Sequence, residues 1–187
     1  LQKDACLIVM GSEGRNEQII KTDQDNALVV KDGIDVEQYR PYMQEITKHL
    51  IDFGYPPCEG NIMVSNPFWC KTVKEYKNET ARWIEAPGMQ NYMDLAIFFD
   101  AFAVAGDKEL LINLKDDLFN KLHDKDVFMA YFAKATLAFD TPATISNFMT
   151  KTHYIDIKKA AVFPIVQGIR SLALREKIRE TTTVKRI

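Results

Sequence analysis

The stretch that decides the fold is Met10–Leu28, with the sequence MGSEGRNEQIIKTDQDNAL. It continues an almost uninterrupted apolar run, Ala5–Met10, which predicts a strand buried on both faces. Gly11-Ser12 breaks that run, a helical turn or two can follow, and Asp25–Lys31 predicts a second strand that ends in a Lys-Asp-Gly turn. The order strand, glycine turn, short helix, paired aspartates and strand predicts a small sheet with polar chemistry at one edge.

The residues beyond this stretch alternate between helical and strand patterns. Apolar residues recur at helical spacing over Tyr39–Leu50, with Gly54 as a helix end, and again over Trp69–Trp83. Met93–Phe102, MDLAIFFDAF, has the apolar and aromatic content of a third buried strand. Asp107 is a suitable N-cap for a further helix with a leucine face.

The remainder of the chain has helical patterns only. Thr141-Pro142 is a typical helix start, and Ile157–Ile178 carries a long apolar stripe that Pro164 interrupts. We therefore expect an α+β fold, with a small mixed β-sheet core flanked by helices over residues 1–120. A helical segment over residues 121–187 would follow, and we expect it to be truncated at its C-terminal end.

Composition narrows the classes of function. The chain has 187 residues, 47% of them hydrophobic, and a formal net charge of −2, which does not favour a nucleic-acid partner. Its three cysteines lack any C-x-x-C spacing, so we expect neither a disulfide framework nor a structural zinc site, but a reducing cytoplasm. No apolar run approaches the roughly 20 residues of a membrane span, so we expect no membrane partner.

Asp23 and Asp25 are the strongest candidates for a metal site. They stand two residues apart at the start of a strand, so both carboxylates project from one face. Two like charges at that spacing repel each other and raise one pKa unless a cation lies between them. Magnesium suits such a pair, because it binds one or two carboxylates and completes its shell with phosphate oxygens. A lone D-x-D is nevertheless a common surface pattern.

Gly11-Ser12 is the candidate phosphate-binding turn. Glycine lets the backbone approach a phosphate, and the serine hydroxyl and nearby amides can donate to its oxygens. Beside a dicarboxylate, this turn is suited to two-metal displacement at phosphorus, which needs a third acidic ligand from a neighbouring strand. Asp100 is the better candidate for that ligand and Asp94 the weaker one.

These residues resemble a known signature. G-S-x-x-x-R followed by D-x-D looks like the DNA polymerase β-like nucleotidyltransferase superfamily. The longer motif resembles a bacterial nucleotidyltransferase family related to the N-terminal part of protein-PII uridylyltransferase and often fused to cyclic-nucleotide-binding and CBS domains. The resemblance extends through Cys58–Met63, Asn66–Trp69, Ile97–Asp100 and Ile155–Arg170, and so covers essentially the whole chain.

The resemblance implies specific roles. Gly11 and Ser12 would bind the phosphates of a nucleoside triphosphate, and three carboxylates would hold Mg²⁺ or Mn²⁺. Arg15 would reach a phosphate or brace Asp23, and the helical segment would bring positive charge to the triphosphate. The residues implied are Asp23, Asp25 and Asp100 for metal and catalysis, and Gly11, Ser12, Arg15, Lys158 and Arg170 for the nucleotide.

Two functions follow from this resemblance. The first is transfer of a uridylyl or adenylyl group from a nucleoside triphosphate to a hydroxyl of a protein or small molecule, with Asp100 as the base. The second is a nucleotide-binding regulatory module with little turnover, joined to sensor domains. Phe102, Asn61 and Cys70 depart from the pattern and favour the second function, because they alter substrate anchoring. Cys58 has no sequence feature of a nucleophile.

Overall fold

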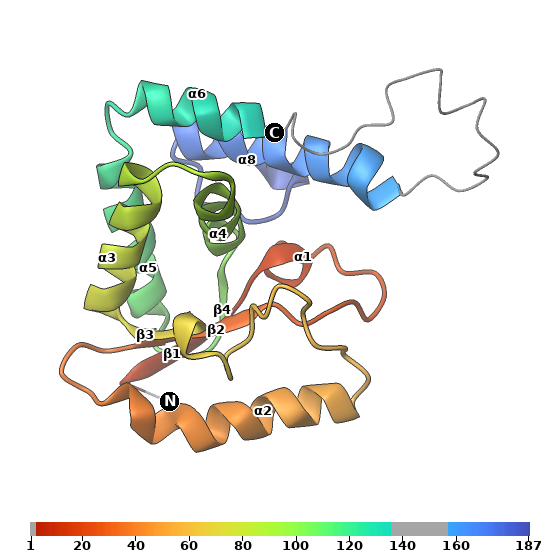
Figure 1. Ribbon diagram of the computed structural model, residues 1–187, viewed down its shortest axis with the longest axis vertical. Helices are drawn as coiled ribbons and strands as arrows, with labels where there is room; N and C mark the ends of the chain where they lie inside the picture. The colour runs from red at the N-terminus through yellow and green to blue at the C-terminus, as the bar shows by residue number, and fades with distance from the viewer. Residues whose placement is uncertain (1–2, 136–156) are drawn as a thin grey trace.

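The computed structural model describes residues 3–135 and 157–187, an α+β fold built on a mixed four-stranded sheet with the order β3-β2-β1-β4 (Figure 1). The central strand β1 pairs antiparallel with both β2 and β4, and β2 pairs parallel with β3. The register places Val9, at the end of β1, opposite Asn26, at the start of β2. The strands are β1 Ala5–Val9, β2 Asn26–Val30, β3 Cys70–Thr72 and β4 Phe102–Gly106.

Helices cover both faces of the sheet. In Figure 1, α3, α4 and α5 lie on one side, α2 on the other, and α6 and α8 form a further layer beyond α4. The α-helices are α1 Gly11–Gly14, α2 Arg40–Asp52, α3 Val73–Glu85, α4 Met89–Phe99, α5 Lys108–Lys121, α6 Asp126–Lys134 and α8 Phe163–Arg175. Short turns are η1 Val36–Tyr39, η2 Pro67–Trp69, the π-helical η4 Lys158–Val162 and η5 Val184–Arg186.

The predicted first two strands and their burial are confirmed. Strand β2 is buried at every position, and its residues alternate between two hydrophobic clusters. Val29 packs with the side chains of α3, α4 and α5, whereas Leu28 and Val30 pack with Met43 of α2. A strand with helices on both faces needs apolar residues throughout, which explains its unbroken apolar pattern.

The expected third strand over Met93–Phe102 is wrong. Met89–Phe99 forms helix α4, and a strand begins only at Phe102. Leu95 and Phe98 are fully buried, because α4 lies between the sheet and the helices beyond it. A buried helix is apolar on all sides, so a short apolar run does not distinguish it from a buried strand. The strand that does form, β4, lies at the sheet edge and is largely exposed.

The predicted helices around the sheet are confirmed, with local signals as their cause. Helix α3 begins at a capping box in which Thr72 and Glu75 bond each other's backbone amides. The Asp107 side chain accepts from Glu109 N at 3.0 Å and caps α5. Gly54 ends α2 with a φ of +88°. The predicted helix start at Thr141-Pro142 lies outside the described residues.

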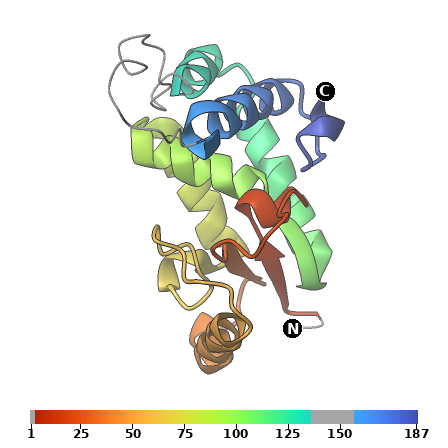
Figure 2. The same cartoon turned by 90° about the vertical axis from the view of Figure 1, so that its right-hand side faces the viewer.

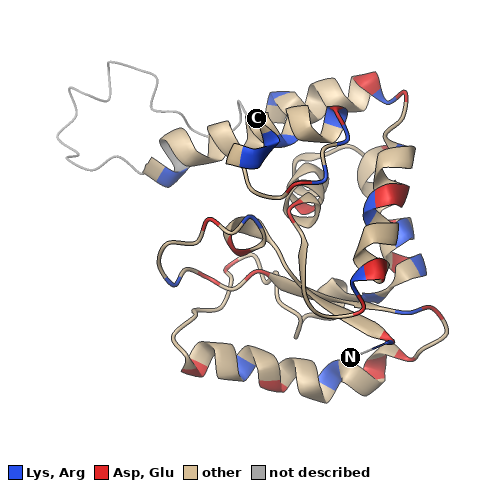
Figure 3. Cartoon of the chain, turned by 180° about the vertical axis from the view of Figure 1, so that it is seen from behind, with Lys and Arg blue, Asp and Glu red and all other residues tan. Residues whose placement is uncertain are grey.

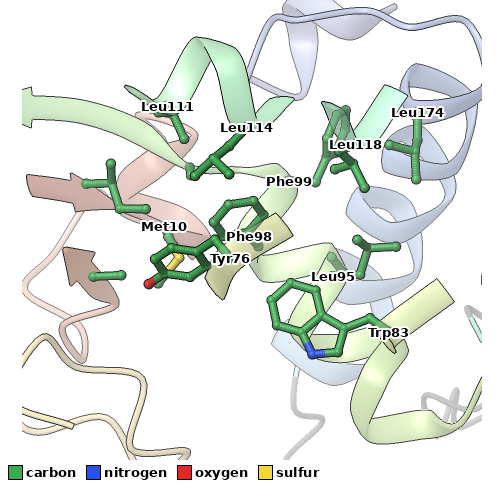
Figure 4. Packing of buried hydrophobic residues seen from close by; sticks show 14 of the residues in the cluster. Met10, Tyr76, Trp83, Leu95, Phe98, Phe99, Leu111, Leu114, Leu118 and Leu174 are labelled. Carbon is green, nitrogen blue, oxygen red and sulfur yellow. The ribbon is translucent and has the colours of Figure 1, made fainter. Parts of the chain in front are cut away.

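One hydrophobic core links the sheet to the C-terminal helices. Figure 4 shows Met10 beside Tyr76 and Phe98, and Leu118 facing Leu174 of α8. The same cluster includes Phe132 of α6, so the division at residue 120 stays a prediction. Among the described helices, none has the length and apolar character needed to cross a membrane.

Candidate active site

The Gly11–Gly14 turn lies between two aspartates. Gly11 has a φ of +55°, and a Cβ built on it would lie 2.3 Å from Asp25 Oδ2. A Cβ on Gly14 would lie 2.3 Å from the backbone oxygen of Asp100. Met10 N donates to Asp25 O at 2.8 Å and ties the turn to the start of β2. Both glycines are therefore needed for the close approach of this turn, and Ser12 lies half-buried within it.

Asp23 and Asp25 come together as expected from their spacing. Their carboxylate oxygens and Cys58 Sγ all lie within 4.8 Å of one another, and both aspartates are partly exposed. Burial raises the pKa of Asp25 to about 6, and the negative charge of Asp23 acts in the same direction. Two oxygen ligands with uncompensated negative charge, open to solvent, are a donor set that fits Mg²⁺ or Mn²⁺.

Cys58 is the third member of this group. Its thiol and the Asp25 carboxylate share a hydrogen bond, which stabilises the charged form of Asp25. Burial raises the pKa of the Cys58 thiol to about 12, so it stays protonated at neutral pH. A protonated thiol is a donor rather than a nucleophile or a ligand for a hard cation. Cys58 therefore orients the Asp25 carboxylate.

Asp100 differs from the expectation that it completes the metal site. It is fully buried, and its two oxygens meet three arginines. Burial alone would raise the pKa of Asp100, but the charges of these arginines outweigh it and hold the pKa below its usual value. The distances to its oxygens are 2.6 Å from Arg15 Nη1, 2.5 Å from Arg170 Nη2 and 2.7 Å from Arg186 Nη1.

The expected cationic residues divide between the two aspartate regions. Arg15 bonds Asp100 and Glu17 rather than bracing Asp23, and Arg170 also bonds Asp100. Lys158 is exposed on η4 with its Nζ 5.4 Å from the Phe163 ring centroid, and its positive charge lowers the pKa of Asp25. Asp94 is buried on α4, where Gln90 Nε2 donates to it at 2.9 Å, and it is not in the acidic group.

Two residues near these aspartates were not singled out from the sequence. Glu13 is half-buried, and burial raises its pKa, with the charge of Asp25 acting in the same direction. Its place in the Gly11–Gly14 turn was a usable signal. Arg186 is buried against Asp100, and its guanidinium lies 4.4 Å from the Phe99 ring centroid. No local pattern indicates that contact, because the two residues are far apart in the sequence.

Charges elsewhere on the molecule are mixed in sign. Figure 3 shows acidic and basic residues interspersed along α2, α3 and α5. Many form local pairs, such as Arg82 with Glu79 on α3 at 2.8 Å and Lys121 with Asp117 on α5 at 2.5 Å. These surface charges have neighbours of opposite sign, whereas Asp23 and Asp25 lie beside each other with the same sign.

A glycine turn next to two aspartates in the loop that leads into β2, on a small mixed sheet, is an arrangement suited to phosphoryl-group chemistry. Residues 2–90 match the family model "Putative nucleotidyltransferase DUF294", and residues 126–187 match "Putative nucleotidyltransferase substrate binding domain". The two models together cover most of the chain, which belongs to this nucleotidyltransferase family. Searches of curated proteins and of solved structures found no match.

Proposed function

We propose that this protein is a metal-dependent nucleotidyltransferase that moves a uridylyl or adenylyl group from a nucleoside triphosphate to a hydroxyl group and releases pyrophosphate. The acceptor is a protein or a small molecule. The observation that carries this proposal is the pair Asp23 and Asp25, which lies beside the Gly11 turn with the pKa of Asp25 raised to about 6. Two neighbouring carboxylates repel each other and destabilise the fold unless a cation binds between them. The Gly11 turn next to them leaves room for the phosphates that such a cation would bind.

The proposed roles follow from exposure and charge. Asp23 and Asp25 would hold Mg²⁺ or Mn²⁺, and such a cation supplies charge neutralisation at phosphorus and a lower pKa for an attacking hydroxyl. Gly11 leaves room for a phosphate oxygen near the backbone, and Ser12 offers a hydroxyl donor. Lys158 is exposed, and its positive charge acts on Asp25, so it is suited to the outer phosphates.

Arg15 and Arg170 would act differently from direct phosphate ligands. Both guanidinium groups already bond Asp100, so we assign them long-range positive potential at the site rather than contact with the nucleotide. We assign no metal to Asp100, because both of its oxygens are taken by arginines.

Glu13 is better suited than Asp100 to be the base. Burial and the charge of Asp25 raise its pKa, whereas the arginines lower that of Asp100. The acceptor O–H proton would pass to the Glu13 carboxylate while the acceptor oxygen forms a bond to the α-phosphorus. The bond from that phosphorus to the bridging oxygen breaks, and pyrophosphate leaves with the electron pair.

The direct test is pyrophosphate release. The protein would be incubated with each labelled nucleoside triphosphate, MgCl₂ and cell extract, and pyrophosphate and labelled products would be measured. One nucleotide should release pyrophosphate and label one class of acceptor. Asp25→Asn should abolish both signals, while Asp52→Asn, a change at an exposed aspartate on α2, should leave them intact. Release that survives Asp25→Asn would contradict the proposal.

A regulatory module that binds nucleotide without turnover is the second candidate. It is favoured by one observation: among the described residues, the acidic group at the turn contains two carboxylates, and Asp100 belongs to a separate ion-pair cluster. In that case the fused sensor domains expected from the family resemblance would be the partners. Nucleotide binding by calorimetry with no pyrophosphate release, in the presence of extract, would favour this function over transfer.

A further inference from the structure

The segment that follows α8, which includes residues 180–186, lies close to the Gly11–Gly14 turn. Figure 2 shows this segment beside α1. Thr183 N donates to Glu17 Oε1 at 2.6 Å, and Arg186 Nη1 donates to Asp100 Oδ1 at 2.7 Å. Arg186 Nε also donates to Glu180 O at 2.6 Å, which folds the segment onto itself. Two separate contacts thus join residues 180–186 to the core.

Both contacts lead to Arg15. Its Nε donates to Glu17 Oε2 at 2.7 Å, and its Nη1 donates to Asp100 Oδ2 at 2.6 Å. Each acceptor therefore binds Arg15 through one oxygen and the C-terminal segment through the other. A planar guanidinium held at two edges has a fixed direction. The direction of Arg15 consequently depends on residues 180–186.

Arg15 is also connected to the acidic pair. Arg15 N donates to Gly11 O at 3.2 Å within the turn, and Gly11 lies so close to Asp25 that a Cβ built on it would be 2.3 Å from Asp25 Oδ2. A shift of Arg15 would change both the backbone of the turn and the potential at Asp25. The connection thus runs from the C-terminal segment to the residues proposed to bind nucleotide.

The cluster around Asp100 contains more positive than negative groups, unlike a simple ion pair, in which the two charges cancel. Arg15, Arg170, Arg186 and Lys115 are buried around Asp100 and Glu17. Burial lowers the pKa of Arg186, and its Nη2 is buried without a hydrogen-bond partner among the described residues. Buried charged groups without a full set of hydrogen-bond partners lower the unfolding free energy. The excess positive charge is useful only toward an anion, and the triphosphate at the Gly11 turn is that anion in the proposed function.

We propose that residues 180–186 are a positioning element of the nucleotide site. Thr183 and Arg186 hold Glu17 and Asp100, which fix Arg15 and the Gly11–Glu17 turn for nucleotide. Asp100 is in this view a positioning residue. The inference rests on the proposed function only for the ligand, because the contacts themselves can be tested without any nucleotide.

Position 183 offers a matched pair of variants. Thr183 has a φ of −54°, which proline adopts, so Thr183→Pro removes the N–H that Glu17 accepts. Thr183→Ala keeps that N–H and removes the hydroxyl and the methyl group of the side chain. Amide exchange over residues 14–17 should rise about tenfold or more in Thr183→Pro and stay at the wild-type rate in Thr183→Ala.

Ligand binding gives the second readout, using MgATP, MgUTP and Mn²⁺ alone in calorimetry. Thr183→Pro should weaken binding of the preferred nucleotide about tenfold, the effect of one lost positioning contact. Mn²⁺ affinity should change by about twofold at most, because residues 180–186 bond Glu17 and Asp100 and act on Asp25 only through the charge of Arg15. Arg186→Met tests the other contact, with Arg179→Met, at an exposed arginine paired with Asp116, as its control.

The possible results distinguish a failure of the positioning role from a failure of the proposed function. Equal amide exchange in Thr183→Pro and Thr183→Ala would overturn the positioning role. A parallel loss of Mn²⁺ and nucleotide affinity in both Thr183→Pro and Arg186→Met would also overturn it, because the segment would then support the fold as a whole. A wild-type protein that binds neither nucleotide would refute the proposed function, while the exchange result would still decide the positioning role.

Discussion

Asp25 and Asp100 lie on either side of one four-residue turn, yet their surroundings are opposite. Asp25 is partly exposed beside another carboxylate, and burial raises its pKa to about 6. Asp100 is fully buried among three arginines that hold its pKa below the usual value. The comparison teaches that the sign of the local charge imbalance, rather than the residue type, decides which aspartate needs a cation: Asp25 has a carboxylate beside it, whereas Asp100 has more positive than negative groups around it.

The largest expected effect is on activity at the acidic pair. Asp23→Asn with Asp25→Asn should lower pyrophosphate release at least about a thousandfold, since the proposed metal ligands are lost. The unfolding free energy should stay the same or rise, because the repulsion between the two carboxylates disappears. Urea unfolding monitored by tryptophan fluorescence would check stability. A large loss of stability would place this pair in the same class as Asp100.

Asp100→Asn should have the largest effect on stability. It would leave the arginines buried without their anion, so the unfolding free energy should fall by about 3–5 kcal/mol. Urea unfolding measures the loss, and Mn²⁺ binding to the remaining folded protein should stay at wild-type affinity. Mn²⁺ affinity that falls as far as in Asp25→Asn would make Asp100 a metal ligand and remove the contrast between the two aspartates.

Gly11→Ala tests how closely the turn must approach Asp25. The new methyl group would meet Asp25 Oδ2 at 2.3 Å, at a φ of +55°. We expect a stability loss of about 1–3 kcal/mol and a much weaker nucleotide affinity. Gly33→Ala is the control, since Gly33 also has a positive φ of +87° but nothing lies within 4 Å of its Cβ position. Equal nucleotide affinity in both variants would argue against a phosphate at this turn.

The smallest expected effect is the pH dependence of stability. Because Asp25 has a folded-state pKa of about 6, above the ordinary aspartate value of 3.8, the folded protein binds one more proton than the unfolded chain between these pH values. Stability contributed by this group is present below about pH 4 and is lost as the pH rises through about 6. The loss should be about 1–2 kcal/mol, since partial exposure screens the charge.

Magnesium should reverse that pH effect. Thermal unfolding at pH 7.5 should shift upward with MgCl₂ by a few degrees, and the shift should vanish near pH 5, where Asp25 holds a proton. Asp25→Asn should remove both the magnesium shift and this part of the pH profile. A magnesium shift of equal size at both pH values would mean that the cation binds elsewhere.

The core of the candidate site was predictable because its information is local. Gly11, Asp23 and Asp25 lie in one continuous stretch, and the two carboxylates stand two residues apart directly before β2. Helix α4 and the surroundings of Asp100 were not predictable in the same way. Whether Met89–Phe99 forms a helix or a strand depends on which of its faces other elements cover. The surroundings of Asp100 depend on Arg170 and Arg186, which are far from it in the sequence and reach it through the packing of the C-terminal residues on α4.

One hydrophobic cluster joins the sheet to the C-terminal helices, which limits how segments can be exchanged between family members. Met10 and Trp83 share a cluster with Phe132 and Leu174, although they come from the two separately matched segments. A chimaera that joins residues 2–125 of this chain to the segment of another family member that corresponds to residues 126–187 would bring together poorly matched side chains. It would also leave Asp100 without two of its partners if the other member lacked Arg170 and Arg186. A unit exchanged between relatives should therefore include both matched segments, residues 2–90 and 126–187, together with the residues between them.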